Sequence, residues 1–235
     1  MNSKRNIKKG LACIGLGLLF ILLLCMDVAV FCLEYVLYQD IMPTGMTVWQ
    51  HCLHFIFICT VWGCGSMALC GLAKEKELLP DLKNNVKRLS GSRIFMLVLI
   101  AAAGILFMSL DMPGMSLRLK PLSELHYFLK QYGSAGVAAF LLQHLYYLFE
   151  SVIILFLVAF GQQAGELLFP FRRTRSVLWG GIFCAMTWGM LHGLTKDWET
   201  AVFCILLSVF FNLSYLAADR RLIPAYLAVA AIFVI

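Results

Sequence analysis

The chain has 235 residues, of which 61% are hydrophobic and only 14% are charged. A water-soluble domain carries about 45–50% apolar and about 25% charged residues. The composition therefore excludes an ordinary soluble domain and predicts an integral membrane protein. The net charge of +6 does not indicate nucleic-acid binding, because the basic residues fall in alternate loops, as in multi-pass membrane proteins.

Seven apolar segments follow one another along the chain. All except the last reach the roughly 17–20 residues that a helix needs to cross a bilayer. Because no period-two alternation is present, we expect helices, and the fold class is predicted to be an all-α polytopic membrane helix bundle. The predicted spans are residues 11–37, 46–73, 93–110, 134–161, 177–194, 198–217 and 222–235.

Lysine and arginine cluster at the N-terminus and in every second loop. The clusters lie in residues 4–9, 74–93, 172–175 and 220–221, whereas the alternate loops hold few basic residues. An excess of Lys and Arg marks the cytoplasmic side of multi-pass proteins. The sequence therefore predicts a multi-pass protein of the cell membrane with a cytoplasmic N-terminus.

One long loop on the predicted outer side, residues 111–133, contains an amphipathic stretch. Ser123 is expected to cap a short helix there, since Ser is a favoured N-cap residue. Tyr127 and Phe128 would lie at the level of the lipid headgroups. The loop is therefore predicted to hold an interfacial helix.

Polar side chains inside apolar segments are costly and mark either functional sites or contacts between helices. Asp27 and Glu34 are seven residues apart and share one face of the first span. His51 and His54 are three residues apart near the start of the second span, a spacing at which two imidazoles can share a metal. Solvated or hydrogen-bonded imidazoles are the alternative for this pair.

Two further polar residues lie within later spans. Glu150 is flanked by apolar residues, so we expect it to be protonated or paired with another group. It lies six residues after His144, so these two side chains face different directions. Asn212 is expected to form a hydrogen bond between helices.

Glu166 and His192 carry the functional hypothesis. Glu166 follows the fourth span and shares a helix face with Gln162, and His192 lies near the end of the next apolar run. With a turn near residues 173–176, the heights of Glu166 and His192 along the bundle axis differ by roughly 12 Å. A kink at Pro170 or a tilt of the helices would be needed to bring the pair together.

Small residues spaced four apart occur near both of these side chains. Gly161 and Gly165 precede Glu166, and Gly189 and Gly193 flank His192. Such spacings let membrane helices approach closely. We therefore expect close helix contacts on both sides of the proposed pair.

Three stretches in the C-terminal third carry an ordered set of motifs. Gly165–Pro170 reads GELLFP, Trp188–His192 reads WGMLH, and residues 204–224 end in LSYLAADRRLIP. In this order they resemble the EELLFR form of a Glu-Glu-x-x-x-Arg motif, a Phe-x-x-x-His motif and the segment leading to a His-x-x-x-Asn motif. These are the signatures of the CAAX prenyl protease and bacteriocin-processing family of intramembrane proteases. The resemblance covers about residues 160–235.

The resemblance implies a hydrolytic site. In that family, the first glutamate and the histidines hold a water, or a metal with its water, which attacks a peptide carbonyl. By this likeness, Glu166 is the catalytic base and His192 holds the water, or both ligate a divalent metal such as zinc. The residues expected to support the site are Glu150, Gln162, Trp188 and Asn212.

Several family positions hold other residues in this chain. Gly165 and Pro170 stand where the first motif has Glu and Arg, and Val229 and Phe233 stand where the third has His and Asn. A catalytic zinc site uses three protein ligands plus water. Either other groups complete the site, or the chain is a non-catalytic relative that binds peptides, as in peptide maturation or bacteriocin self-protection.

The domain organisation follows from the spans and the resemblance. Residues 1–235 are predicted to form one membrane domain, in which 1–133 supply N-terminal helices and two long loops and 134–235 a protease-like core. The expected partners are the lipid bilayer and a membrane-bound peptide or prenylated tail. Two alternatives stay open. One is a small transporter with an acidic proton or cation path, and the other is a structural subunit of a membrane complex.

Overall fold

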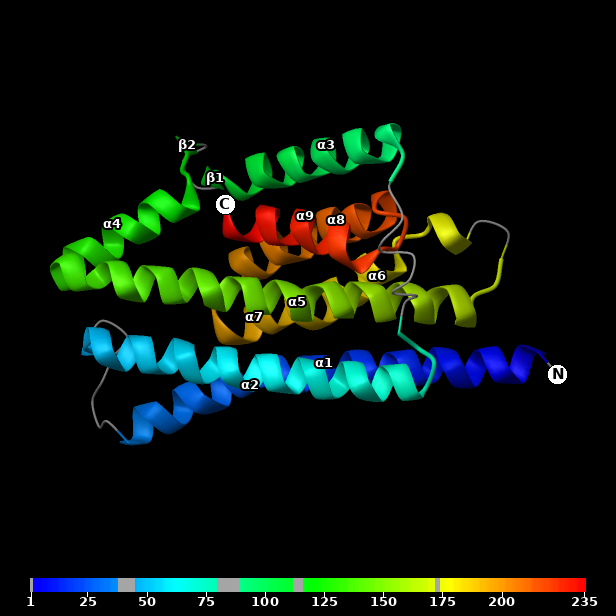
Figure 1. Cartoon of the computed structure of the whole chain (residues 1–235), viewed down its shortest axis with the longest axis horizontal. Helices are drawn as coiled ribbons and strands as arrows, with labels where there is room; N and C mark the ends of the chain where they lie inside the picture. The colour runs from blue at the N-terminus through cyan, green and yellow to red at the C-terminus, as the bar shows by residue number, and fades with distance from the viewer. Residues whose placement is uncertain (1, 38–44, 80–88, 112–115, 172–173) are drawn as a thin grey trace.

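The computed structural model describes the whole chain except residues 1, 38–44, 80–88, 112–115 and 172–173 (Figure 1). The described part is a helix bundle, apart from a short antiparallel pair of β1 (Leu110–Asp111) and β2 (Ser116–Leu117). The predicted all-α bundle is therefore confirmed. The α-helices are α1 (Asn2–Leu37), α2 (Val48–Glu75), α3 (Gly91–Met108), α4 (Lys120–Tyr132), α5 (Gly136–Leu168), α6 (Trp179–Cys184), α7 (Met190–Thr195), α8 (Trp198–Ala217) and α9 (Leu222–Val234).

Five helical stretches are long and apolar enough to cross a membrane. They are α1, α2, α3, the stretch Lys120–Leu168 that contains α4 and α5, and α8. The π-helix η5 (Ala185–Gly189) joins α6 to α7, so helix covers most of the predicted fifth span. Helix α9 covers the predicted seventh span and is shorter than the others. Each predicted span therefore coincides with helix.

The two ends of the bundle differ in charge. At one end, α1 and α9 begin and α5 ends, and three ion pairs lie there: Lys9 with Glu77, Arg93 with Asp219, and Arg220 with Glu166. We refer to this as the basic end; positive charge predicts that it faces the cytoplasm. At the opposite, far end, α1 and α9 finish and α2, α5 and α8 begin (Figure 1).

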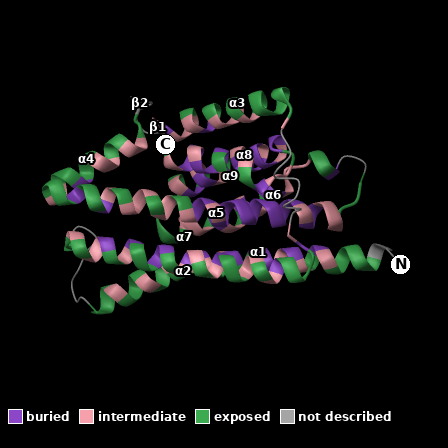
Figure 2. Cartoon of the chain, viewed as in Figure 1, coloured by how far each residue is buried: buried purple, intermediate pink, exposed green. Residues whose placement is uncertain are grey.

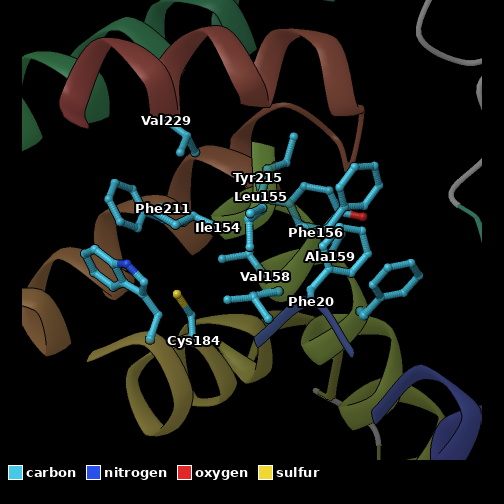
Figure 3. Close-up of a cluster of buried hydrophobic side chains, with 14 of the residues drawn as sticks. Phe20, Ile154, Leu155, Phe156, Val158, Ala159, Cys184, Phe211, Tyr215 and Val229 are labelled. Atoms are coloured by element: carbon cyan, nitrogen blue, oxygen red, sulfur yellow. The ribbon is translucent and has the colours of Figure 1, made fainter. Parts of the chain in front are cut away.

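Helix α5 runs through the middle of the bundle. Its residues Ile153–Phe160 are all apolar and at most 8% exposed (Figure 2), as expected of a helix that is covered on every side. Phe20 of α1 stacks on Phe156 with 4.9 Å between ring centroids. Phe211 of α8 and Val229 of α9 are also fully buried in this cluster (Figure 3). We call these residues the central apolar block.

Glycines allow α6 to lie directly against α5. A Cβ atom built on Gly180 would overlap the carbonyl oxygen of Val158, and one on Gly165 would overlap the indole of Trp179. A Cβ on Gly161 would come within 2.5 Å of Phe183 Cβ. The close approach predicted at the Gly161 and Gly165 spacing is therefore confirmed, because no larger side chain fits between these helices.

A helix lies within residues 111–133, as predicted, but its predicted start is wrong. Helix α4 begins at Lys120 with Leu119 in the N-cap position, and the Ser123 hydroxyl donates to the Lys120 carbonyl inside the first turn. Pro121 explains the difference, since proline favours the first turn of a helix. Phe128 is buried against α2 and α5, so α4 folds back over the far end.

Candidate ligand cavity

A cavity of about 620 Å³ lies in the far half of the bundle. Its walls come from α1, α2, α3, α4, α5, η5, α7, α8 and α9, and the contributions of the long helices α1, α5 and α8 come from their far-end halves. The cavity therefore ends where the central apolar block begins. The acidic and basic residues that line it are Asp27, His54, Lys120, Glu124, Glu150, His192 and Lys196.

Glu150, Trp188 and His192 lie together in the cavity wall. The Trp188 indole Nε1 donates to Glu150 Oε1 at 3.0 Å, and the Trp188 and His192 rings meet edge to face with 4.8 Å between centroids. His192 Nδ1 lies 2.9 Å from the Trp188 carbonyl oxygen. Because a carbonyl only accepts, Nδ1 carries the hydrogen, and Nε2 of the neutral ring is left as an acceptor.

A π-helix sets the register of this group. The segment η5 contains Trp188 and lies between α6, which packs closely on α5, and α7, which carries His192. The Thr187 hydroxyl donates to the carbonyl of Phe183 within the same stretch. Such single π turns are frequent at functional sites. A π turn contains one residue more than an α turn. With this extra residue, the same segment packs against α5 through α6 and lines the cavity through Trp188 and His192.

A second polar cluster joins α1, α2 and α5. His54 Nδ1 lies 2.8 Å from Glu34 Oε2, and His54 Nε2 lies 3.1 Å from Asp27 Oδ1. The Tyr146 hydroxyl donates to the other oxygen of Asp27 at 3.0 Å. Both ring nitrogens of His54 therefore face carboxylate oxygens, an arrangement that favours the imidazolium form. Asp27 and Glu34 do share a face, as predicted.

The two histidines of α2 have separate partners. His51 Nδ1 lies 2.8 Å from the Tyr132 hydroxyl of α4, whereas His54 lies between two carboxylates. The hydrogen-bonded alternative predicted for this pair therefore fits the structure better than a shared metal. The sequence did not reveal that Asp27, Glu34 and His54 form one cluster. The sequence did contain one indication of the cluster: acidic residues lie in the first span and a histidine lies in the second, and consecutive spans run antiparallel.

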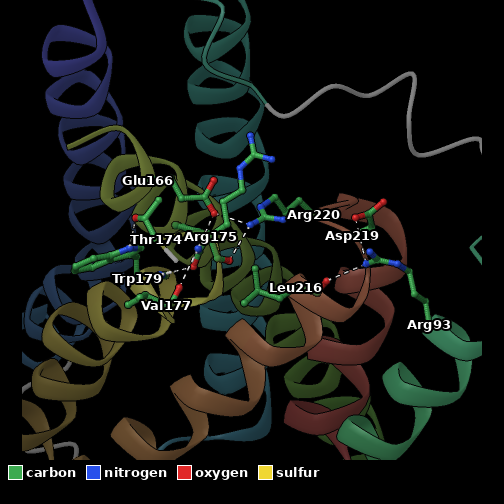
Figure 4. Close-up of polar contacts among 11 residues, drawn as sticks. Arg93, Glu166, Thr174, Arg175, Val177, Trp179, Leu216, Asp219 and Arg220 are labelled. Carbon is green, nitrogen blue, oxygen red and sulfur yellow. Dashed lines mark hydrogen bonds and ion pairs between the residues drawn. The ribbon is translucent and has the colours of Figure 1, made fainter. Parts of the chain in front are cut away.

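Glu166 lies at the basic end, away from the cavity. Its Oε1 accepts from Arg220 Nη2 at 2.6 Å and from Gln162 Nε2 at 2.8 Å (Figure 4). Arg220 also donates to the carbonyl of Arg175 at 3.1 Å. Glu166 therefore ties α5 to the turn between α8 and α9 and to the segment before α6.

The structure does not bring Glu166 and His192 together. Glu166 lies sixteen positions beyond Glu150 on the same helix α5, about 24 Å along its axis at 1.5 Å per residue. Glu150 in turn contacts Trp188, one turn before His192. The predicted shared site disagrees with this geometry, because α5 continues to Leu168 and the expected kink is absent, Pro170 lying beyond its end.

Gln162 and Asn212, predicted to support the site, instead satisfy the start of α6. Gln162 Oε1 accepts from the Gly180 N–H at 3.2 Å, and Asn212 Oδ1 accepts from the Gly181 N–H at 2.7 Å. Leu178, in the N-cap position, supplies no side-chain acceptor. The first N–H groups of a helix have no partner within it. The predicted hydrogen bond of Asn212 between helices is therefore confirmed.

The residues present do not fit the zinc site that the resemblance implies. Within the described ranges, no three His, Cys, Asp or Glu side chains are grouped so that they could hold a metal ion. Glu166 and His192, the two predicted metal ligands, lie at different levels of the bundle. Catalytic zinc takes three protein ligands plus water, so this set does not supply a metal centre.

The positions of the family's third motif are apolar and lie in different surroundings. Val229 is fully buried in the central apolar block. Phe233 lines the cavity, and its ring meets the Trp188 ring with 5.8 Å and the Tyr147 ring with 5.4 Å between centroids. Neither position of the third motif therefore supplies a polar group to the cavity.

Comparison with protein-family models, curated proteins and solved structures finds no match to this chain. The resemblance to CAAX-type proteases therefore rests on the motifs within residues 160–235. Of the residues that it singles out, Trp188 and His192 lie in the cavity wall together with Glu150.

Replacing Glu166 with Ala is expected to lower the free energy of unfolding by about 1 kcal/mol, the magnitude of a partly exposed ion pair. Binding of ligands in the cavity should not change, because Glu166 lies at the basic end. Denaturant unfolding in detergent measures the first effect, and a double-mutant cycle with Arg220→Ala isolates the pair. A loss of cavity binding at unchanged stability would contradict this placement of Glu166.

Proposed function

We propose that this chain is a divergent relative of the CAAX-type intramembrane proteases that binds a membrane-associated peptide or a prenylated tail at the cell membrane. The observation that carries the proposal is the cavity of about 620 Å³, which combines apolar walls with acidic and basic side chains. Ligand sites have volumes of about 300–1,000 Å³ and a similar mixture of groups. Ionisable groups at membrane depth are costly unless function retains them.

The apolar walls suit a ligand that comes from the lipid phase. Val28 and Phe31 of α1 line the cavity and are also 40% and 37% exposed at the surface of the bundle. Phe203 of α8 lines the cavity as well. An apolar chain in the membrane can therefore pass from lipid to the cavity wall without crossing water. A peptide or prenylated tail has such a chain joined to polar groups.

The same cavity provides two groups for acid–base chemistry. His192 Nε2 is an acceptor that can take a proton from water, and the Glu150 carboxylate lies against the neighbouring Trp188. A general base must be within hydrogen-bond reach of the proton that it removes. If the bound peptide is hydrolysed, Glu150 and His192 are the residues that act, and Glu166 is not.

The proposal is tested with purified protein in lipid nanodiscs. A fluorescent apolar peptide, with and without a farnesyl group, is titrated, and its products are analysed by mass spectrometry. We expect saturable binding that weakens about tenfold in His192→Ala and Glu150→Gln, on the order of one lost polar contact to a charged group. His126→Ala is the matched control, because His126 is exposed on α4. Failure of the native protein to bind either peptide would overturn the proposal.

Transport is a second candidate, favoured by the cluster of Asp27, Glu34 and His54 within the spans. A transport path has to continue to the basic end, however, and Ile153–Phe160 fill the middle of the bundle with apolar side chains. We expect no proton flux in liposomes. A flux that is lost in Glu150→Gln would favour transport over binding.

A further inference from the structure

We propose that Lys120 and Lys196 bind an anionic end group, a carboxylate or a phosphate, on the apolar chain that occupies the cavity. This inference rests on the proposed function and specifies its ligand. Lys120 is the first residue of α4 and Lys196 follows α7, so the two approach the cavity from different elements. Both lie at the far end, where the ligand's polar end would remain when its apolar chain lies against the walls.

The Lys120 ammonium is held in place by neighbouring groups but keeps hydrogen-bond donors that have no acceptor among the residues described. Its Nζ donates to the Phe233 carbonyl at 3.0 Å. The same nitrogen lies 3.6 Å from the centroid of the Tyr147 ring and 4.6 Å from that of Phe233, which are cation–π distances. A lysine ammonium has three donors, and only one of them has a carbonyl partner.

Two carboxylates of the cavity each accept a hydrogen bond through one oxygen, while the buried Glu124 Oε2 has no partner within the part of the chain that the structure describes. Glu124 Oε1 accepts from the Tyr147 hydroxyl at 2.7 Å, and Glu150 Oε1 accepts from the Trp188 indole at 3.0 Å. Among the described residues, no carboxylate oxygen comes within 4.0 Å of the ammonium of Lys120 or Lys196. Two ammonium groups therefore line one cavity without an ion-pair partner.

The positions of the two lysines also point to a ligand. Lys196 lies near enough for its charge to act on Lys120, so one anion can interact with both. Two like charges beside one cavity repel each other; Lys196 is exposed, whereas Lys120 is partly buried, and a buried charge is costly unless it is paired. Loops on the outer side of membrane proteins hold few basic residues, yet two of those in this chain line the cavity. An anionic end group would compensate both charges.

Binding to the full-length protein in nanodiscs is measured by calorimetry with two matched pairs of probes. The first pair is farnesyl phosphate and farnesol. The second is an apolar octapeptide with a free C-terminal carboxylate and the same peptide as its amide. We expect the anionic member of at least one pair to bind about tenfold more tightly than the neutral member. The pair that shows the preference identifies the source of the anion.

Variants separate anion recognition from a structural role. Lys120→Gln and Lys196→Gln are expected to bind the anionic and the neutral member of a pair equally, and circular dichroism verifies that the variants are folded. Lys130→Gln, on the exposed side of α4, should retain the preference. Glu124→Gln removes the nearest carboxylate on α4 and should tighten anion binding. If Lys120 served only as the partner of Glu124, Lys120→Gln and Glu124→Gln would each leave the preference for the anionic probe intact.

The outcomes distinguish this inference from the proposed function. Equal binding of anionic and neutral probes by the native protein would overturn the role of the lysines and leave a ligand-binding cavity. A preference that survives in both lysine variants would also overturn it. Absence of binding by all four probes would reject both the inference and the proposed function.

Discussion

Replacing Gly180 with Ala is expected to lower the free energy of unfolding by about 3 kcal/mol, the upper part of the range for overpacked cores. The added methyl group would overlap the Val158 carbonyl oxygen, which belongs to the backbone of α5 and has no rotamer to change. Helix α6 would have to move away from α5. Denaturant unfolding in mixed micelles, followed by circular dichroism, measures the loss.

Gly15→Ala is the matched control for this prediction. Gly15 lies in the long apolar helix α1, and a Cβ built there meets nothing within 4 Å. The substitution should leave stability unchanged or raise it by up to about 1 kcal/mol, since alanine favours helix. Equal stability of Gly180→Ala and Gly15→Ala would show that α5 and α6 do not approach as closely as described.

The sequence predicts the spans well because composition and helix length are local properties. The differences occur at helix ends, where polar residues find partners from other elements. Helix α5 ends at Leu168, seven residues beyond the predicted end of its span. It can continue because Gln162 contacts the start of α6 and Glu166 pairs with Arg220. These partners are far away in sequence, so no local pattern indicates them.

The pairing of polar residues was less predictable than the helices. Spacing within one helix gives a shared face, which is why Asp27 and Glu34 were correctly placed together. It does not give the relative height of two helices joined by a loop. The sequence therefore left a meeting of Glu166 and His192 open. In the structure α6 begins only at Trp179, and α7 carries His192 toward the far end.

The polar residues within the helices divide into two groups by position. Those of the basic half close the fold: Glu166 binds Arg220, and Asn212 binds the start of α6. Those of the far half line or border the cavity, such as Glu124 and Glu150. The central apolar block separates the two groups. Function is thus expected from the far half and stability from the basic half.

Replacing Asn212 with Leu is expected to lower the free energy of unfolding by about 2 kcal/mol, the cost of leaving a buried donor unpaired. The Gly181 N–H would lose its acceptor at the buried start of α6, where Leu178 offers no alternative. Gln162→Leu should have a similar effect through the Gly180 N–H. Because both serve the same turn, the double variant should deviate from additivity.

Ser214→Ala is the matched control on the same helix α8, since the buried Ser214 hydroxyl has no hydrogen-bond partner. Its removal should leave stability nearly unchanged. The segment that begins with α6 continues through η5 to His192, so fraying of its start also displaces a wall of the cavity. Asn212→Leu should therefore weaken ligand binding although it contacts no ligand, whereas Ser214→Ala should not. Unchanged binding in a measurably destabilised Asn212→Leu would show that the cavity wall is held independently of this turn.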